Sequence, residues 1–142
     1  MLKPKIFIVY AKEDSNMARK LYKDLKQEGI ELWLDEEELA PGQDWDLEIQ
    51  KAIRESPVVL TLISSNTVKK KGFTQKELKR ALDIIEEKPE GSIYIIPVRI
   101  DDCQIDAKLQ QYHWLDLFPS YSEGLRKLIR ALKPDITTWD RR

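Results

Sequence analysis

The sequence predicts an α/β fold with a parallel sheet, because short apolar runs alternate with longer segments of helical period. The runs at residues 6–10 and 58–63 are nearly continuous and rich in β-branched residues, as expected for strands covered on both faces. A length of 142 residues with 42% hydrophobic residues fits one domain with a substantial core. We therefore expect a flavodoxin-like three-layer sandwich: a five-stranded parallel sheet of order 2-1-3-4-5 with helices on both faces.

The individual elements follow from local signals. Strands are expected at residues 5–10, 30–34, 58–63, 92–100 and, more briefly, 113–116. Helices are expected from a cap at Asp14 or Ser15 to Gly29, from a cap at Asp44 to Ser56, over about 73–87, and over 123–132. Pro97 cannot donate to a ladder, so the fourth strand is expected to end near it or to lie beside an edge.

Composition excludes several classes of function. The 24 basic and 25 acidic residues nearly cancel, so charge suggests neither a direct nucleic-acid partner nor a membrane partner. One cysteine and one histidine argue against an intrachain disulfide, a Cys-rich zinc site or a His-based metal centre. No apolar run reaches the ~18–20 residues that span a bilayer, and no signal-peptide cleavage site follows the first run. A cytoplasmic location is expected.

Familiar nucleotide motifs are also missing from the sequence. It contains no GxGxxG after the first strand, no GxxxxGK[ST] and no nucleophile elbow. The third strand runs into Ser64 and Ser65 rather than into the aspartate that a receiver domain would phosphorylate. A ligand of such a sheet still lies beyond the carboxyl ends of the strands. This rule indicates the loops at residues 11–14, 35–43 and 64–72 and the loop after Val98.

Four segments carry motifs in a consistent order: IFIVYAKED at 6–14, GIELWLD at 29–35 followed by LAPG at 39–42, SPVVLTLIS at 56–64, and GFTQKEL at 72–78. Together they resemble Toll/interleukin-1 receptor (TIR) domains, and the resemblance covers about residues 5–130. The loop sequences and the Lys-Gly-Phe-x-x-x-Glu motif look more like those of bacterial members than those of animal receptor adaptors. The resemblance implies an NAD-cleaving domain that needs no metal or cofactor and takes NAD⁺ as its substrate.

Glu77 is the catalytic residue that the resemblance implies, since it ends the family's aromatic-xxx-Glu motif. Phe73 stands where the family most often has Trp; it keeps a stacking face but loses the indole N–H donor. Helical spacing puts Glu77 at the boundary of the expected buried face and on the same side as Phe73. The alternative is a solvated carboxylate, or one paired with Arg80.

The resemblance also implies a set of substrate-binding residues at the carboxyl ends of the strands: Tyr10, Ala11, Lys12, Trp33, Asp35, Leu39, Trp45, Ser64 and Phe73. Two of them have simple structural alternatives. Trp45 heads an apolar stripe and would then be a core anchor, whereas Asp35 would be a turn residue.

Two segments of opposite charge suggest self-association. The acidic loop at 35–45 of one copy would meet the basic loop at 69–76 of the next, in a head-to-tail contact that builds open filaments. Solvated faces are the alternative, and the basic loop could also attract the pyrophosphate of NAD⁺.

The expected function is an NAD⁺ glycohydrolase that releases nicotinamide and ADP-ribose, or a cyclic ADP-ribose, in antiphage or immune signalling. The alternatives are a non-enzymatic TIR–TIR adaptor module and an unrelated flavodoxin-like nucleotide binder. A TIR domain is expected over 1–133, with a tail or linker over 134–142. An NAD-destroying domain must be restrained, so a sensor domain or partner protein is expected.

Overall fold

The computed structural model describes residues 5–34, 41–42, 44–56, 58–66, 83, 94–105, 109–110 and 112–132. Its elements, in chain order, are β1 (Lys5–Val9), η1 (Lys12–Asp14), α1 (Ser15–Gln27), β2 (Glu31–Trp33), α3 (Trp45–Glu55), β3 (Val58–Ile63), β4 (Tyr94–Arg99), β5 (Leu115–Asp116) and α6 (Tyr121–Leu132). The helix expected over 73–87 lies outside the described residues apart from Asp83, which is helical.

The five strands form one sheet of order β2-β1-β3-β4-β5, and every neighbouring pair is parallel. This confirms the expected 2-1-3-4-5 order. Phe7 of β1 stands opposite Trp33 of β2 and Val59 of β3, which fixes the register at the centre of the sheet. The chain adds β2 on one side of β1 and then returns to add β3 on the other side, with β4 and β5 beyond it. The switch point of the sheet therefore lies between β1 and β3.

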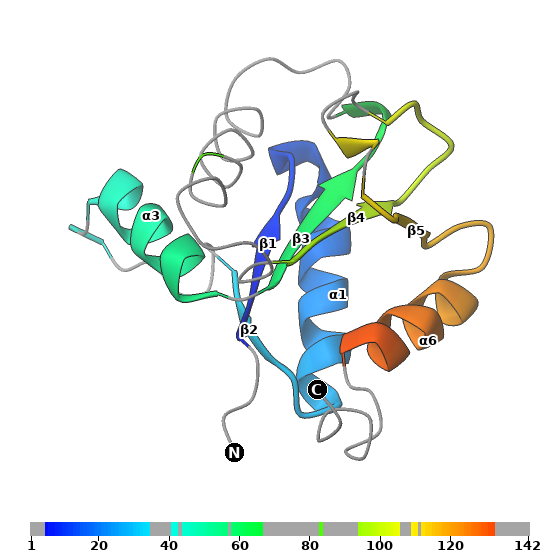
Figure 1. Cartoon of the computed structure of the whole chain (residues 1–142), viewed down its shortest axis with the longest axis horizontal. Coiled ribbons are helices and arrows are strands. Elements are labelled where there is room, and N and C mark those ends of the chain that lie inside the picture. Colours follow the sequence, from blue (N-terminus) through cyan, green and yellow to red (C-terminus); the bar gives the residue numbers. More distant parts are fainter. Residues whose placement is uncertain are drawn as a thin grey trace.

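Helices cover both faces of the sheet (Figure 1): α1 and α6 lie on one side and α3 on the other. The alternation along β1 separates two cores, because Ile6 and Ile8 pack toward α1 and α6 whereas Phe7 and Val9 pack toward α3. Full burial of a side chain such as Leu21 or Leu25 stabilises the fold by about 1.5–3 kcal/mol. Among the described helices, none is both long and apolar enough to cross a membrane.

The end of α1 is set by Gly29, as the sequence predicts. Gly29 has φ +82°, a conformation that disfavours side chains with a Cβ. Its N–H donates to the carbonyl of Lys26 at 3.0 Å, and the N–H of Ile30 donates to the carbonyl of Leu25 at 3.2 Å. These two bonds form a Schellman motif, which satisfies the last carbonyls of the helix and turns the chain into β2.

The predicted cap of α3 is also present. The N–H of Leu47 donates to Oδ1 of Asp44 at 3.1 Å, in the position of an N-cap bond. At the other end the hydroxyl of Ser56 donates to the carbonyl of Ala52 at 2.6 Å, where the helix stops. Both helix ends therefore lie where side-chain chemistry alone would put them.

β4 ends at Arg99, two residues after Pro97, and lies beside β5, the edge strand of the described sheet. This confirms the expectation that the fourth strand ends near Pro97 or lies beside an edge. Within this sheet β5 pairs only with Val98 and Arg99, so Pro97 stands just before this second neighbour begins, where a missing donor is tolerated. Two other sequence expectations need correction. Asp14 precedes α1 without capping it through its side chain, which is engaged elsewhere. α6 begins at Tyr121, two residues before the expected start.

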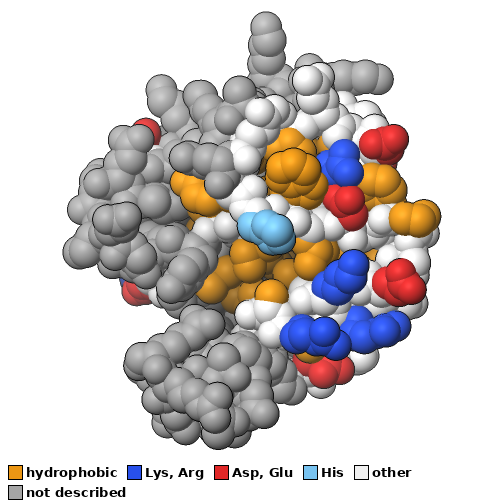
Figure 2. All heavy atoms as spheres, turned by 45° about the vertical axis from the view of Figure 1, so that its right-hand side comes forward, with side chains coloured by type: hydrophobic (Ala, Val, Ile, Leu, Met, Phe, Trp, Pro, Cys, Tyr) orange, Lys and Arg blue, Asp and Glu red, His pale blue; other side chains and the backbone are white. Residues whose placement is uncertain are grey.

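The outer faces of α1 and α6 are predominantly basic. Their exposed basic residues are Arg19, Lys20, Lys23, Lys26, Arg126, Lys127 and Arg130. Exposed carboxylates such as Glu28 and Glu123 stand among them. Figure 2 shows blue, red and orange side chains interspersed on one described face, so charge there is mixed rather than of one sign.

Candidate functional site

A buried polar network joins the carboxyl ends of β1 and β3 at the switch point. Asp14 follows β1, is 7% exposed, and accepts two hydrogen bonds from the segment that follows β3. The hydroxyl of Ser64 donates to its Oδ2 at 2.5 Å, and Nδ2 of Asn66 donates to its Oδ1 at 2.8 Å. Both carboxylate oxygens are therefore used, as a buried charged group requires.

Ser64 shapes the chain where β3 ends. Its Oγ accepts the N–H of Asn66 at 3.0 Å, so it starts a helical turn at Ser65 and Asn66 in the manner of an N-cap. At the same time it donates to Asp14. A single hydroxyl thus fixes both the direction of the chain after β3 and its contact with the end of β1.

A second carboxylate holds the same turn from the side of β4. The N–H of Ser65 lies 3.1 Å from both Oδ1 and Oδ2 of Asp101, and the hydroxyl of Ser65 donates to Oδ2 at 3.0 Å. The N–H of Ile100 extends the ladder by donating to the carbonyl of Ile63 at 2.9 Å. The segment 64–66 is therefore held by hydrogen bonds to two carboxylates, one that follows β1 and one that follows β4.

Arg99 connects β4 to the edge strand β5. Its Nε and Nη2 donate to the two carboxylate oxygens of Asp116 at 2.8 Å and 3.0 Å, and its Nη1 donates to the carbonyl of Cys103 at 2.9 Å. The hydrogen bond to Asp116 raises the pKa of Arg99 above its ordinary value. The guanidinium also lies 5.1 Å from the ring centre of Phe118. This bidentate pair holds the two-residue strand β5 against β4.

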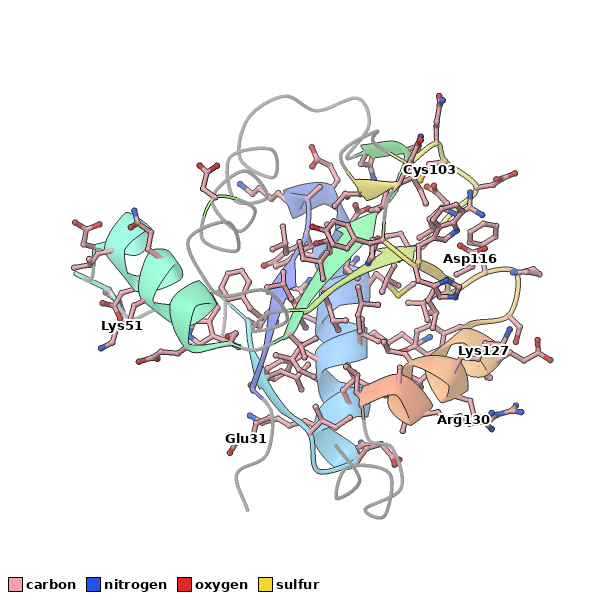
Figure 3. All side chains as sticks on the ribbon, in the orientation of Figure 1. Glu31, Lys51, Cys103, Asp116, Lys127 and Arg130 are labelled. Atoms are coloured by element: carbon pink, nitrogen blue, oxygen red, sulfur yellow. The ribbon has the colours of Figure 1, made fainter. Side chains whose placement is uncertain are left out.

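In Figure 3, Cys103 and Asp116 lie toward the carboxyl end of the strands, whereas Glu31 lies at the opposite end. Burial, together with a hydrogen bond to Asp101 and the negative charge of that residue, raises the pKa of the Cys103 thiol to about 11. The thiol is therefore neutral near pH 7 and is no nucleophile there.

The structure brings some of the predicted site residues together. The N–H of Asp14 donates to the carbonyl of Ala11 at 2.8 Å while its side chain receives Ser64, so Ala11 and Ser64 are connected through one residue. Ala11 and Ser64 are buried, and Lys12 between Ala11 and Asp14 is exposed. These three follow β1 and β3 at the switch point of the sheet.

Other predicted residues lie in the cores or outside the described part. Tyr10 is 4% exposed and belongs to the core under α1 and α6. Trp33 stacks on Phe7 in the opposite core, with ring centres 4.9 Å apart. Trp45 is the first residue of α3. The predicted residues outside the described ranges are Asp35, Leu39, Phe73 and Glu77, as are most of the two charged loops.

Sequence reasoning did not single out Asp14, Asn66 and Asp101 as site-forming residues. The signal was present, because all three are polar residues within a few positions of strand ends that the sequence predicts. Parallel strands bring such ends to one edge of the sheet. What the sequence lacked was the pairing, since the two hydrogen-bond partners of Asp14 stand about fifty residues further along the chain.

A doubly wound parallel sheet with a polar network at its switch point defines a flavodoxin-like domain, a class of protein in which ligands bind beyond the carboxyl ends of the strands. The family model described as "TIR domain" matches residues 6–129 of this chain. The chain therefore belongs to the TIR domain family. The sequence is 29% identical over 129 residues to uncharacterized protein y4cD of Sinorhizobium fredii. The match covers 90% of this chain but only 20% of that relative.

Solved structures agree with the fold. The TIR domain of the Toll-related receptor TRR-2 from Hydra magnipapillata superposes with a TM-score of 0.73 at 24% identity, over 90% of this chain and 97% of that one. The CMP N-glycosidase BcmB of Clostridium botulinum superposes with a TM-score of 0.57 at 18% identity, over 87% and 96% of the two chains. At these identities the likeness concerns the fold.

Proposed function

We propose that this chain is an NAD⁺ glycohydrolase in which Glu77 is the catalytic carboxylate. The observation that supports it most is the arrangement at the switch point, where Ala11 and Lys12 follow β1, Ser64 follows β3, and Asp14 is hydrogen-bonded to both Ala11 and Ser64. The TIR resemblance assigns substrate contacts to Ala11, Lys12 and Ser64. Membership of the TIR family and the presence of a Glu in its aromatic-xxx-Glu motif add support.

The chemistry requires little beyond a placed carboxylate. The bond between the nicotinamide nitrogen and C1′ of the ribose breaks, and its electron pair leaves with nicotinamide, which becomes neutral. The ribose becomes oxocarbenium-like, and ionised Glu77 would stabilise that positive charge and hold the ribose hydroxyls. Water then adds at C1′ and loses a proton, giving ADP-ribose; attack by a nucleophile of the ADP-ribose itself gives a cyclic product.

The likeness to BcmB gives this chemistry a parallel. BcmB is a CMP N-glycosidase. The nicotinamide–ribose linkage of NAD⁺ is also an N-glycosidic bond between a base and a ribose. One sheet architecture is thus compatible with this class of bond cleavage, although a fold by itself does not assign an activity.

The test is nicotinamide release from millimolar NAD⁺ by the purified chain and by Glu77→Ala and Glu77→Gln. We expect release by the wild type and a loss of at least about a hundredfold in both variants, because the transition-state charge loses its counterion. Arg80→Ala is a matched control from the same segment, and its rate should stay close to the wild type. Equal rates for wild type and Glu77→Gln would refute the proposal.

An adaptor predicts no release from any of these proteins. In that case binding to another TIR domain, followed by analytical ultracentrifugation, becomes the relevant measurement. We further propose that the activity serves antiphage or immune signalling in the cytoplasm, restrained by a sensor domain or partner protein. Co-expression of a candidate restraining protein should then lower the cellular loss of NAD⁺.

A further inference from the structure

We infer that Asp14 is a positioning residue that holds the two halves of the substrate site in a fixed relation. What it positions rests on the proposed function; how it does so rests on described contacts alone. Its backbone N–H donates to the carbonyl of Ala11 after β1, and its carboxylate accepts from Ser64 and Asn66 after β3. One residue thus bridges both sides of the switch point.

The bridge is specific because both carboxylate oxygens of Asp14 and the hydroxyl of Ser64 have directional partners. Oδ1 accepts from Asn66 and Oδ2 from Ser64, and Ser64 in turn accepts the N–H of Asn66. These three residues therefore close a ring of hydrogen bonds, to which Asn66 contributes both its side-chain amide and its backbone N–H. Rotation of any one of them breaks at least one bond in a buried environment, where each broken bond is costly.

Stability alone is a weak reason for such a ring. Asp14 is a carboxylate that is 7% exposed, and moving a charge out of water offsets much of what its hydrogen bonds contribute. An apolar contact at the same place would stabilise the domain as well. It would not set the direction in which the chain leaves β3, toward the sequence that carries Phe73 and Glu77.

Asp101 reinforces the same segment from the opposite side. Its carboxylate receives both the N–H and the hydroxyl of Ser65. The segment 64–66 is therefore clamped between a carboxylate that follows β1 and a carboxylate that follows β4. Of the two, Asp14 is the one that also contacts Ala11, a predicted substrate contact.

An exchange of the Asp14 carboxylate and the Asn66 amide distinguishes a positioning role from a general contribution to stability. In Asn66→Asp two carboxylates face each other where Nδ2 of Asn66 now lies 2.8 Å from Oδ1 of Asp14, and the ring should open. When Asp14→Asn is combined with Asn66→Asp, the amide introduced at position 14 can donate to the carboxylate introduced at position 66, while the amide oxygen accepts from Ser64. The pair is then restored with the partners exchanged. Asp14→Asn alone is mild, since either amide can flip.

Two readouts are compared for these variants well below their melting temperatures. Nicotinamide release should fall about tenfold or more in Asn66→Asp through kcat rather than KM, because the catalytic geometry rather than affinity is disturbed. It should return to within about threefold of the wild type in the double variant. Amide hydrogen exchange at Ser65 and Asn66 should rise by a similar factor in Asn66→Asp and return in the double variant.

Tyr121→Phe is the matched control. It removes a part-buried hydrogen bond of 2.5 Å from the Tyr121 hydroxyl to Asp24 of α1, away from the carboxyl edge. It should lower the melting temperature while leaving both readouts at the wild-type level. A wild type without nicotinamide release overturns the glycohydrolase and leaves exchange to decide the positioning role. If Asn66→Asp changes neither readout more than Tyr121→Phe does, the positioning role is overturned.

Discussion

At the scale of single residues, burial raises the pKa of two side chains, Cys103 and Tyr121. Cys103 is 8% exposed and packs in the core beside Ile105 and Leu109. Asp101 nearby makes the thiolate still less favourable. Tyr121 behaves alike: burial, and then its hydrogen bond to Asp24, raise the pKa of its hydroxyl. In both cases the folded state prefers the neutral form, so both groups weaken the fold only in alkali.

The Cys103 shift predicts an alkaline loss of stability. Its pKa rises from the ordinary 9.0 to about 11, so the unfolded chain ionises first as the pH rises. The full contribution is present below about pH 9 and is lost between 9 and 11, by an amount on the order of 2–3 kcal/mol. Urea unfolding over this range should show a shallower fall for Cys103→Ala. Parallel curves for the two proteins would contradict the assignment.

At the scale of the elements, α6 packs closely against β5 at Gly124. Gly124 is buried in the first turn of α6, and a Cβ placed on it would collide with the carbonyl oxygen of Asp116 and approach Cα of Leu117 to 2.8 Å. Both are backbone atoms, so neither can rotate away. The glycine is therefore required by contact between two elements and not by its own conformation.

Gly124→Ala should destabilise the domain by about 1–3 kcal/mol, although alanine favours an isolated helix by about 1 kcal/mol. The reason is that α6 must move off β5 to admit the methyl group. Ser122→Ala, on the exposed side of the same helix turn, should change stability by less than about 0.5 kcal/mol. Thermal unfolding of the two variants checks this prediction. Equal melting temperatures would show that α6 can move away from β5 at no cost in stability.

At the scale of the whole molecule, charge is distributed unevenly around a nearly neutral chain. The exposed sides of α1 and α6 carry mostly basic residues, with fewer acidic ones between them. The acidic run and the basic run that the sequence predicts as docking partners belong to the segments 35–45 and 69–76, which lie mostly outside the described residues. Their pairing between copies stays a prediction.

If that docking is electrostatic, self-association should weaken steeply with salt. Raising ionic strength shortens the screening length from about 10 Å at 0.1 M to about 3 Å at 1 M. Light scattering of the purified chain should therefore report smaller particles as salt increases. Replacement of Lys69, Lys70 and Lys71 by Gln should have the same effect at low salt. Particles of constant size across this range would rule out charge as the cause.

The sequence alone determined the fold because its signals are local and repeated. The bounds of β3, the end of α1 at Gly29 and the cap of α3 at Asp44 all followed from neighbouring residues. The order of the strands followed from the alternation of strands and helices with right-handed crossovers. Pro97 is tolerated within β4, near its end, because in the described sheet β5 pairs only with Val98 and Arg99 and no second strand stands beside the proline.

Only the tertiary structure decided which polar residues meet at the carboxyl edge. From the sequence Asp14 looks like a helix cap, and nothing local indicates that its carboxylate turns instead to Ser64 and Asn66. The same holds for the contact between Gly124 and β5. Local propensity acts between residues a few positions apart, whereas these contacts depend on how the parallel strands and the helices pack together in space.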